Sequence, residues 1–203
     1  VATMSKLPFS FYQSSDTVAV ARSLIGKVLV TCFDGLETSG IITETEAYHQ
    51  NEKACHAYNG RRTKRTSILF EQGGLAYIYL CYGIHHLFNI VTSRIDRAHA
   101  VLVRAIEPLD GIDHMLARRK LQEVTTRLTA GPGLLTKAMG IDISKNDMEL
   151  LKENKIWIED HEIKIEADQI ISSPRVGVQY AEECAAWPWR FRLRDNKWCS
   201  PAK

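Results

Sequence analysis

The chain has 203 residues and a mass of 23.0 kDa, and 45% of its residues are hydrophobic while 25% are charged. This composition is ordinary for one compact domain covering residues 1–203, and no run of 18 apolar residues could span a membrane. The formal net charge of +2 and the sequence pI of about 8.3 exclude a strongly basic protein. Any contact with nucleic acid must therefore come from local clusters of cations.

Cysteine usage and the first residues indicate an intracellular protein without a structural metal. No Cys-x-x-Cys pair occurs and no histidine completes a zinc motif, so we expect reduced thiols, no metal and no cofactor. Neighbouring His85 and His86 are interpreted as structural. Residues 1–13 lack an apolar run long enough for a signal peptide, and a first residue other than Met indicates a trimmed or expressed fragment. The five cysteines are Cys32, Cys55, Cys81, Cys184 and Cys199.

In chain order, the first predicted elements are a helix and a hairpin. Apolar residues recur at helical spacing over Thr17–Ile25, and Gly26 supplies the C-terminal stop. Residues 27–33 are β-rich, Asp34-Gly35 is a two-residue hairpin signal, and a second strand is expected from residue 36 to residue 48.

The second strand of this hairpin carries two carboxylates in a sequence that otherwise indicates a buried strand. Residues two apart share a face of an extended strand, so we expect one face to hold Ile42, Glu44, Glu46 and Tyr48. The simpler interpretation is that the glutamates only face solvent. However, carboxylates roughly 6.6 to 7 Å apart along a strand should raise at least one pKa unless a cation or hydrogen-bond donor compensates. This energetic cost favours a functional site.

A basic segment follows the acidic strand. Residues 49–65 are polar and predict a loop, whose end places four cations within five positions. Such a run is typical of a solvated face and equally typical of a phosphate-binding loop, and the sequence favours neither. The four cations are Arg61, Arg62, Lys64 and Arg65.

Tyrosines are concentrated in the next predicted strand, residues 75–82. Tyr77 is interpreted as a core or sheet-surface ring. Tyr82 precedes Gly83, where the strand should turn, and is better placed to project outward.

Two further strands are predicted over residues 84–93 and 100–106. Asn89, in the first, is most simply a hydrogen-bonded structural amide. Arg104, in the second, lies among aliphatic residues and should find a carboxylate, because burying an unpaired guanidinium is costly.

The last part of the chain predicts two helices and a hairpin. The first helix is expected over residues 110–120, and the second follows Gly131-Pro132-Gly133 and covers residues 134–139. Free amides at the start of the second helix can hold an anion. Residues 155–159 and 162–166 predict a hairpin around residues 160–161. Together these elements predict a mixed α/β fold, a single domain in which helices surround a curved antiparallel β-sheet core.

Several motifs, in the same order along residues 16–194, resemble the alkyladenine, or 3-methyladenine, DNA glycosylase family. The matching pieces are Thr45-Glu46-Ala47-Tyr48, His56, Tyr77-Ile-Tyr79-Leu-Cys-Tyr82-Gly83 with Asn89, Val101-Leu-Val-Arg104-Ala-Ile-Glu107-Pro108, Gly131-Pro132-Gly133 and Pro174-Arg175-Val-Gly177-Val.

The resemblance implies a role for each matching residue. Glu46 matches the general base that activates a water to attack the sugar C1′ of a flipped nucleotide, and Arg104 matches the arginine that helps to hold this water. Tyr82 matches the wedge that fills the gap left in the base stack. Asn89 matches the residue that obstructs the 2-amino group of guanine. The rings expected to sandwich the flipped base are Tyr48, His56 and Tyr79.

The implied activity is that of a monofunctional DNA glycosylase, because no amine is placed as a Schiff-base nucleophile. Its substrates would be alkylated or deaminated purines in double-stranded DNA, namely 3-methyladenine, 7-methylguanine, hypoxanthine and ethenoadenine. We expect a monomer that contacts no membrane and acts at the chromosome, in the cytoplasm of a bacterium or the nucleus of a eukaryote. The DNA backbone is expected to contact Arg61, Arg62, Lys64, Arg65 and Lys137.

The sequence departs from the family pattern in two places. The segment between Tyr48 and His56 is one residue shorter than usual, and Leu134 replaces the usual lysine, with Lys137 one helical turn later. Two alternative functions would use some of the same residues. A glycoside hydrolase is disfavoured, because carboxylates on one strand point in parallel whereas that reaction needs them on opposite sides of a bond. A non-catalytic module that binds damaged DNA would keep the aromatic and basic residues without turnover.

Overall fold

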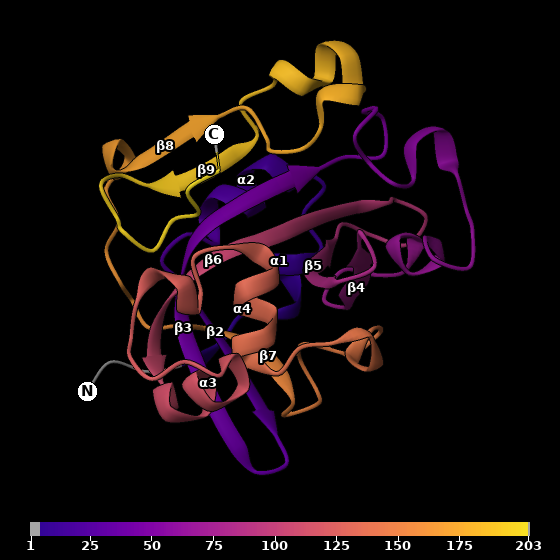
Figure 1. Cartoon of the computed structure of the whole chain (residues 1–203). Helices are drawn as coiled ribbons and strands as arrows, with labels where there is room; N and C mark the ends of the chain where they lie inside the picture. Colours follow the sequence, from indigo (N-terminus) through magenta and orange to yellow (C-terminus); the bar gives the residue numbers. More distant parts are fainter. Residues whose placement is uncertain (1–4, 203) are drawn as a thin grey trace.

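The computed structural model describes residues 5–202. Residues 1–4, which begin the segment expected to lack a signal peptide, and residue 203 lie outside the described residues. Within residues 5–202, nine strands form one sheet in which every pairing is antiparallel (Figure 1). The strands are β1 (Ser5–Lys6), β2 (Val28–Phe33), β3 (Leu36–Tyr48), β4 (Ala76–Cys81), β5 (His85–Thr92), β6 (His99–Asp110), β7 (Ile156–Asp160), β8 (Ile170–Ser173) and β9 (Arg190–Leu193).

The order of the strands places β3 near the centre of the sheet. The main path runs β1-β7-β2-β3-β6-β5-β4, and β9 joins it by pairing with β3 on one side and β8 on the other. Because β3 pairs with β2, β6 and β9 along its length, its backbone is held more completely than that of an edge strand.

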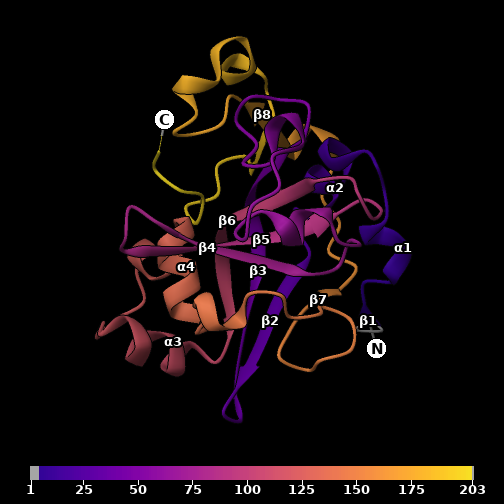
Figure 2. The same ribbon diagram turned by 90° about the vertical axis from the view of Figure 1, so that its right-hand side faces the viewer.

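The α-helices cover the sheet and confirm the predicted mixed α/β fold. In Figure 2, α3 and α4 lie on one side of the sheet, and α1 and α2 lie on the other. Helix α2 packs against β3 and β6, whereas α4 packs against β5 and β6. No helix within residues 5–202 is long and apolar enough to cross a membrane. The helices are α1 (Phe9–Tyr12), α2 (Thr17–Ser23), α3 (Ile112–Arg119) and α4 (Pro132–Met139).

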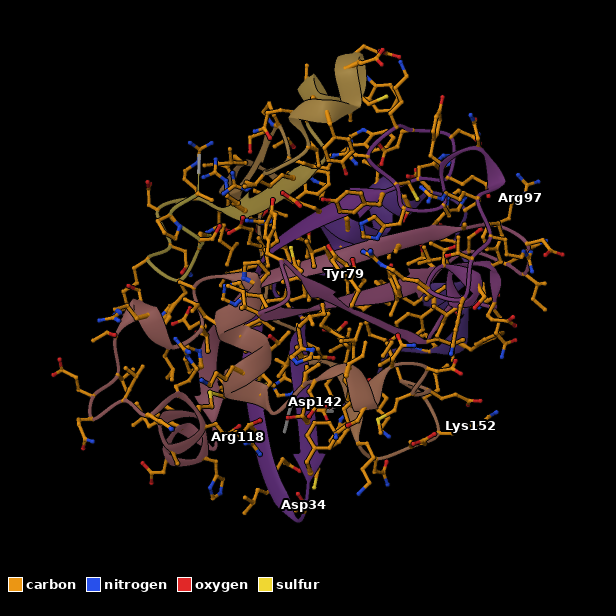
Figure 3. The ribbon with its side chains drawn as sticks, turned by 45° about the vertical axis from the view of Figure 1, so that its right-hand side comes forward. Asp34, Tyr79, Arg97, Arg118, Asp142 and Lys152 are labelled. Carbon is orange, nitrogen blue, oxygen red and sulfur yellow. The ribbon has the colours of Figure 1, made fainter. Side chains whose placement is uncertain are left out.

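Local signals explain the first helix and the hairpin that follows it. The Asp16 side chain caps α2 by accepting a hydrogen bond from the Ala19 amide. The β2–β3 turn uses Asp34 and Gly35, whose φ values of 54° and 76° fit a two-residue hairpin turn, and Figure 3 shows Asp34 at its tip. The predicted helix and hairpin are both present, although α2 ends at Ser23 and not at Ile25.

Two register shifts interrupt the alternation predicted for β3. The β3–β6 register shifts between Ile42 and Glu44 and again between Glu44 and Thr45. One shift adds a residue to β3 and the other adds a residue to β6, so the two shifts cancel. Ile42 pairs with Ile106 and Glu46 pairs with Leu102, four residues further on along each strand. Ile42 and Glu46 therefore share a face of the sheet, as predicted.

The hairpin predicted over residues 155–166 is also wrong. Residues 156–160 do form β7, but residues 162–166 form no strand. Both edges of β7 are already paired, one with β1 and the other with β2, so no edge is left for a following strand. Helix α3 begins at Ile112 and not at residue 110, because Asp110 still pairs with Ser39 at the end of β6.

Candidate active site

A cavity of about 650 Å³ opens beside the β4–β5 hairpin and the N-terminus of α4. In Figure 3, Tyr79, one of the residues that line it, lies near the middle of the view. Aromatic side chains are concentrated in its wall, as is common in sites that bind planar ligands. Its lining includes Tyr48, His56, Arg65, Tyr77, Tyr79, Tyr82, Asn89, Arg104, Leu134, Val176 and Tyr180.

Strand β3 supplies two fully buried carboxylates, and the first of them, Glu44, is engaged on every side. Its Oε1 accepts hydrogen bonds from Arg104 Nε and Arg190 Nε, both at 2.7 Å. The amide of Ser200 donates to Oε2 at 2.6 Å, and the Ser200 hydroxyl donates to Oε1 at 2.9 Å. Glu44 does not line the cavity. This carboxylate therefore acts as a structural anchor between β3, β6, β9 and the end of the chain.

The second carboxylate, Glu46, is held by groups that themselves line the cavity. Tyr48 Oη donates to Oε2 at 2.8 Å, and Arg104 Nη1 approaches the same oxygen at 3.4 Å. The Val176 amide donates to Oε1 at 2.8 Å. A carboxylate oxygen can accept two hydrogen bonds, and within residues 5–202 Oε1 accepts only the bond from Val176. Oε1 can therefore accept one more hydrogen bond. Glu46 thus lies directly behind the cavity surface.

Charge and burial fix the protonation of the groups around Glu46. Burial alone would lower the pKa of Arg104, but the adjacent Glu46 and Glu44 outweigh burial and raise that pKa. Burial and the neighbouring Glu46 raise the pKa of the Tyr48 phenol well above its ordinary value. Arg104 is therefore a permanent cation and Tyr48 a neutral donor. The prediction that Arg104 pairs with a carboxylate is confirmed.

The aromatic wall is built by His56 and two tyrosines of β4. The His56 ring meets the Tyr79 ring edge to face, with centroids 4.7 Å apart and an interplanar angle of 80°, and its Nδ1 lies 2.9 Å from Tyr77 Oη. Burial, with a smaller effect of the Arg65 charge, lowers the pKa of His56 to about 4. The imidazole is consequently neutral near pH 7 and forms part of an uncharged aromatic surface.

The predicted basic cluster is divided between the cavity and the surface. The Arg65 guanidinium lies 4.7 Å from the centroid of the Tyr79 ring and within 3.3 Å of Tyr77 Oη and the His56 ring nitrogens. Arg62 pairs with Asp96 at 2.5 Å. The other predicted backbone contacts are exposed and form no ion pair with another residue of the described part of the chain: Arg61, Lys64 and Lys137.

The β4–β5 turn presents Tyr82 to solvent at the mouth of the cavity. Its side chain is 90% exposed, and both it and Gly83 adopt positive φ, 49° and 72°. Leu80 and Ile84 on either side are also exposed, so the tip is an apolar projection. The outward position predicted for Tyr82 is confirmed.

Asn89 lies deeper in the same hairpin. It is a buried residue of β5 that lies opposite Tyr77 of β4, and its Nδ2 donates a hydrogen bond to the Tyr77 carbonyl at 3.2 Å. The expected structural hydrogen bond is therefore present, and the amide also faces the cavity.

Sequence reasoning gave no role to the ion pair that positions Val176. Arg175 forms a bidentate pair with Glu52, at 2.7 and 2.9 Å, and also donates to the carbonyls of Ala47 and Cys184. Burial would lower the pKa of Arg175, but hydrogen bonding and charge from Glu52 raise it. This pair joins the end of β3 to the segment that supplies the Val176 amide. Arg175 belonged to a recognised motif, whereas Glu52 in its polar loop carried no signal.

Comparison with known proteins finds one matching family. The model of the family described as methylpurine-DNA glycosylase (MPG) matches residues 10–197. A protein of Natranaerobius thermophilus is 43% identical over 197 residues, covering 96% of this chain and 98% of its own length. Proteins of Chlamydia felis and Chlamydia abortus are 45% and 46% identical, covering 94% and 92% of this chain and 97% of their own lengths. All three carry the provisional name 3-methyladenine DNA glycosylase.

The chain belongs to the methylpurine-DNA glycosylase family. It is thus an enzyme of DNA repair whose substrate is DNA, and the resemblance drawn from its motifs is confirmed.

Both departures from the family pattern have a structural setting in this methylpurine-DNA glycosylase. In the shortened segment, His49 stacks on His99 with ring centroids 3.9 Å apart, and the Gln50 amide donates to His99 Nδ1. This contact fixes the chain as it leaves β3 toward His56. Leu134 lines the cavity in the first turn of α4, so the usual lysine is replaced by an apolar contact.

Proposed function

We propose that this chain is a monofunctional DNA glycosylase that flips a damaged purine out of duplex DNA, hydrolyses its N-glycosidic bond and leaves an abasic site for base excision repair. The observation that carries the proposal is the position of Glu46, buried behind an aromatic cavity and held by Tyr48, Arg104 and the Val176 amide. Substrates would be alkylated or deaminated purines of the 3-methyladenine, 7-methylguanine, hypoxanthine and ethenoadenine class.

In the proposed reaction, Glu46 accepts a proton from water while the water oxygen attacks the sugar C1′. The free acceptor position on Oε1 would receive this water, and Arg104 would help to orient the water. A general base typically accelerates a reaction by roughly 10² to 10⁴, which corresponds to about 3 to 5 kcal/mol of barrier.

The flipped base would enter between the rings of Tyr48, His56 and Tyr79. Alkylation at N3 or N7 makes a purine cationic, so electron-rich rings favour it through a cation–π contribution. Arg65 already lies over Tyr79 and carries the same charge as such a base. We propose that Arg65 swings toward a DNA phosphate as the base enters, which reconciles its place in the cavity with a backbone contact.

Two hairpin residues would control entry. Tyr82, at the exposed tip, would fill the space left in the stack and offset the few kcal/mol that unstacking costs. Asn89, in the wall, would exclude the 2-amino group of guanine by obstruction. Exposed Arg61, Lys64 and Lys137 would contact the DNA backbone, and the monomeric enzyme would act at the chromosome, in the cytoplasm of a bacterium or the nucleus of a eukaryote.

Hydrolysis without strand cleavage is supported by the cavity lining, which includes no lysine from residues 5–202. An amine is needed for the Schiff base through which bifunctional glycosylases cut DNA. Glycoside hydrolysis by paired glutamates is disfavoured because Glu44 is fully occupied by Arg104, Arg190 and Ser200.

The test is single-turnover release of 3-methyladenine and hypoxanthine from duplex DNA by the wild type and Glu46→Gln, compared at equal occupancy of the DNA. We expect Glu46→Gln to bind damaged DNA with unchanged affinity and to release base at least 10²-fold more slowly. Glu37→Gln makes the same chemical change at an exposed position of β3 and should match the wild type.

Two results would contradict the proposal. A Glu46→Gln rate within a few-fold of the wild type would remove Glu46 as the general base. A wild-type protein that binds damaged DNA and releases no base would be a recognition module on a glycosylase scaffold.

A further inference from the structure

A second cavity, of about 590 Å³, lies on the other side of the segment that supplies Val176. One wall is formed by Arg190 and Arg192 of β9, a second by Ser173 and Arg175, and a third by residues 200–202. Val178 is the one residue that lines both this cavity and the cavity beside Tyr79, among the residues that the structure describes. The second cavity is therefore separate from the candidate active site.

Three residues in the wall of this second cavity carry buried hydrogen-bond donors without partners. Six buried side-chain polar atoms within residues 5–202 have no hydrogen-bond partner, and three of them belong to residues of its wall. Folded proteins rarely leave buried donors unpaired, and such groups often mark a position for a bound ion or ligand. The three atoms are Ser173 Oγ, Arg175 Nε and Arg192 Nε.

The charges around the second cavity leave one cation uncompensated. Arg175 is paired with Glu52, and Arg190 is paired with Glu44. Arg192 forms neither an ion pair nor a side-chain hydrogen bond with any residue of the described chain. No carboxylate from residues 5–202 lines this cavity. Within residues 5–202 the site thus offers a free guanidinium and further donors, and no carboxylate lines it.

This arrangement fits an anion with several oxygens. The planar guanidinium of Arg192 presents donors in a fork that matches phosphate geometry, and the wall beside it holds two more unpartnered donors, Ser173 Oγ and Arg175 Nε. The volume is typical of pockets for small organic molecules and leaves room for more than a bare phosphate. Pro174, Val178 and Pro201 supply apolar surface for such a group.

We propose that the second cavity binds a phosphate group, free or carried by a nucleotide, through Arg192, Arg175 Nε and Ser173. The site does not depend on the glycosylase reaction proposed for the first cavity. It is nevertheless linked to that cavity, because Arg175 precedes the Val176 amide that holds Glu46, and Arg190 holds Glu44.

The test is calorimetric titration of the full chain with inorganic phosphate and with deoxyadenosine 5′-monophosphate, at ionic strength held constant with chloride. We expect saturable binding by the wild type and at least tenfold weaker binding by Arg192→Gln. Arg194→Gln removes the same charge from an exposed position two residues further on, outside the cavity, and should change affinity less than twofold.

A second variant keeps the test decisive if Arg192→Gln folds poorly. Gln179 lines the cavity and is exposed, so Gln179→Glu should fold normally and weaken phosphate binding by repulsion. Tighter binding of the nucleotide than of phosphate would identify a nucleotide as the ligand, and equal binding would identify free phosphate. Displacement of bound phosphate by undamaged duplex would identify the DNA backbone as its source. Absence of binding, or equal weakening by Arg192→Gln and Arg194→Gln, would overturn the proposal.

Discussion

Replacing Glu44 by glutamine should destabilise the fold far more than the same change at Glu46. Glu44 has no exposed surface and receives two arginine Nε donors, from Arg104 and Arg190, which are themselves 5% and 2% exposed. The neutral amide leaves Arg190 without a carboxylate, and removing one partner of a buried ion pair costs about 3 to 5 kcal/mol. For a chain of this length, that loss lowers the melting temperature by roughly 6 to 20 °C.

The measurement is urea denaturation of Glu44→Gln, Glu46→Gln and the exposed control Glu37→Gln, followed by fluorescence. Glu37→Gln should change the free energy of unfolding by less than about 0.5 kcal/mol. Adding Arg190→Met to Glu44→Gln should recover part of the loss, because the double variant no longer buries an unpaired cation. A loss below about 1 kcal/mol for Glu44→Gln would refute the view that this carboxylate anchors the site.

Two further predictions concern the cavity. Tyr82→Ala should leave the free energy of unfolding within about 0.5 kcal/mol of the wild type, because Tyr82 is 90% exposed. The same change should slow single-turnover release of the base by about 5- to 150-fold, because a lost stacking contact is worth roughly 1 to 3 kcal/mol. A slower rate that is explained by a lower melting temperature alone would contradict this prediction. His56 has a folded-state pKa lowered to about 4 from its ordinary 6.5, so the unfolded chain takes up the proton first and stability falls as the pH drops from 6.5 toward 4. His56→Gln should therefore reduce the fall in the urea midpoint between pH 6.5 and pH 4.5. The reduction should be partial, because burial and His49 lower the pKa of His99 in the same way. An unchanged fall in the midpoint would show that His56 is not buried in its neutral form.

Short-range signals predicted the parts of the fold that depend on a few neighbouring residues. Asp34-Gly35 specified the β2–β3 turn. Gly131-Pro132-Gly133 marked the start of α4, although the helix begins at Pro132, two residues before the predicted first residue. In the candidate site, the cost of burying an unpaired guanidinium was enough to predict that Arg104 would pair with a carboxylate. The turn expected at Gly83 predicted the outward position of Tyr82.

Long-range pairing accounts for what the sequence did not reveal. The two register shifts around Glu44 depend on the pairing of β3 with β6, so the pattern of residues 41–48 could not show them. The failed hairpin after β7 depends on β1 and β2. The distinction between two similar glutamates depends on Arg190 and Ser200, which lie about 150 positions further along the chain.

The contact between Glu44 and Ser200 also sets the order in which a working enzyme is made. Every residue that lines the cavity beside Tyr79 has been synthesised once the ribosome reaches Tyr180, but β9 and Ser200 follow later. A nascent chain of that length contains all of the groups that would recognise a base, while Glu44 still lacks two of its partners. The residues that would recognise a base are therefore synthesised before the last partners of Glu44, and a chain that ended near Tyr180 would lack the contacts of Arg190 and Ser200 with Glu44.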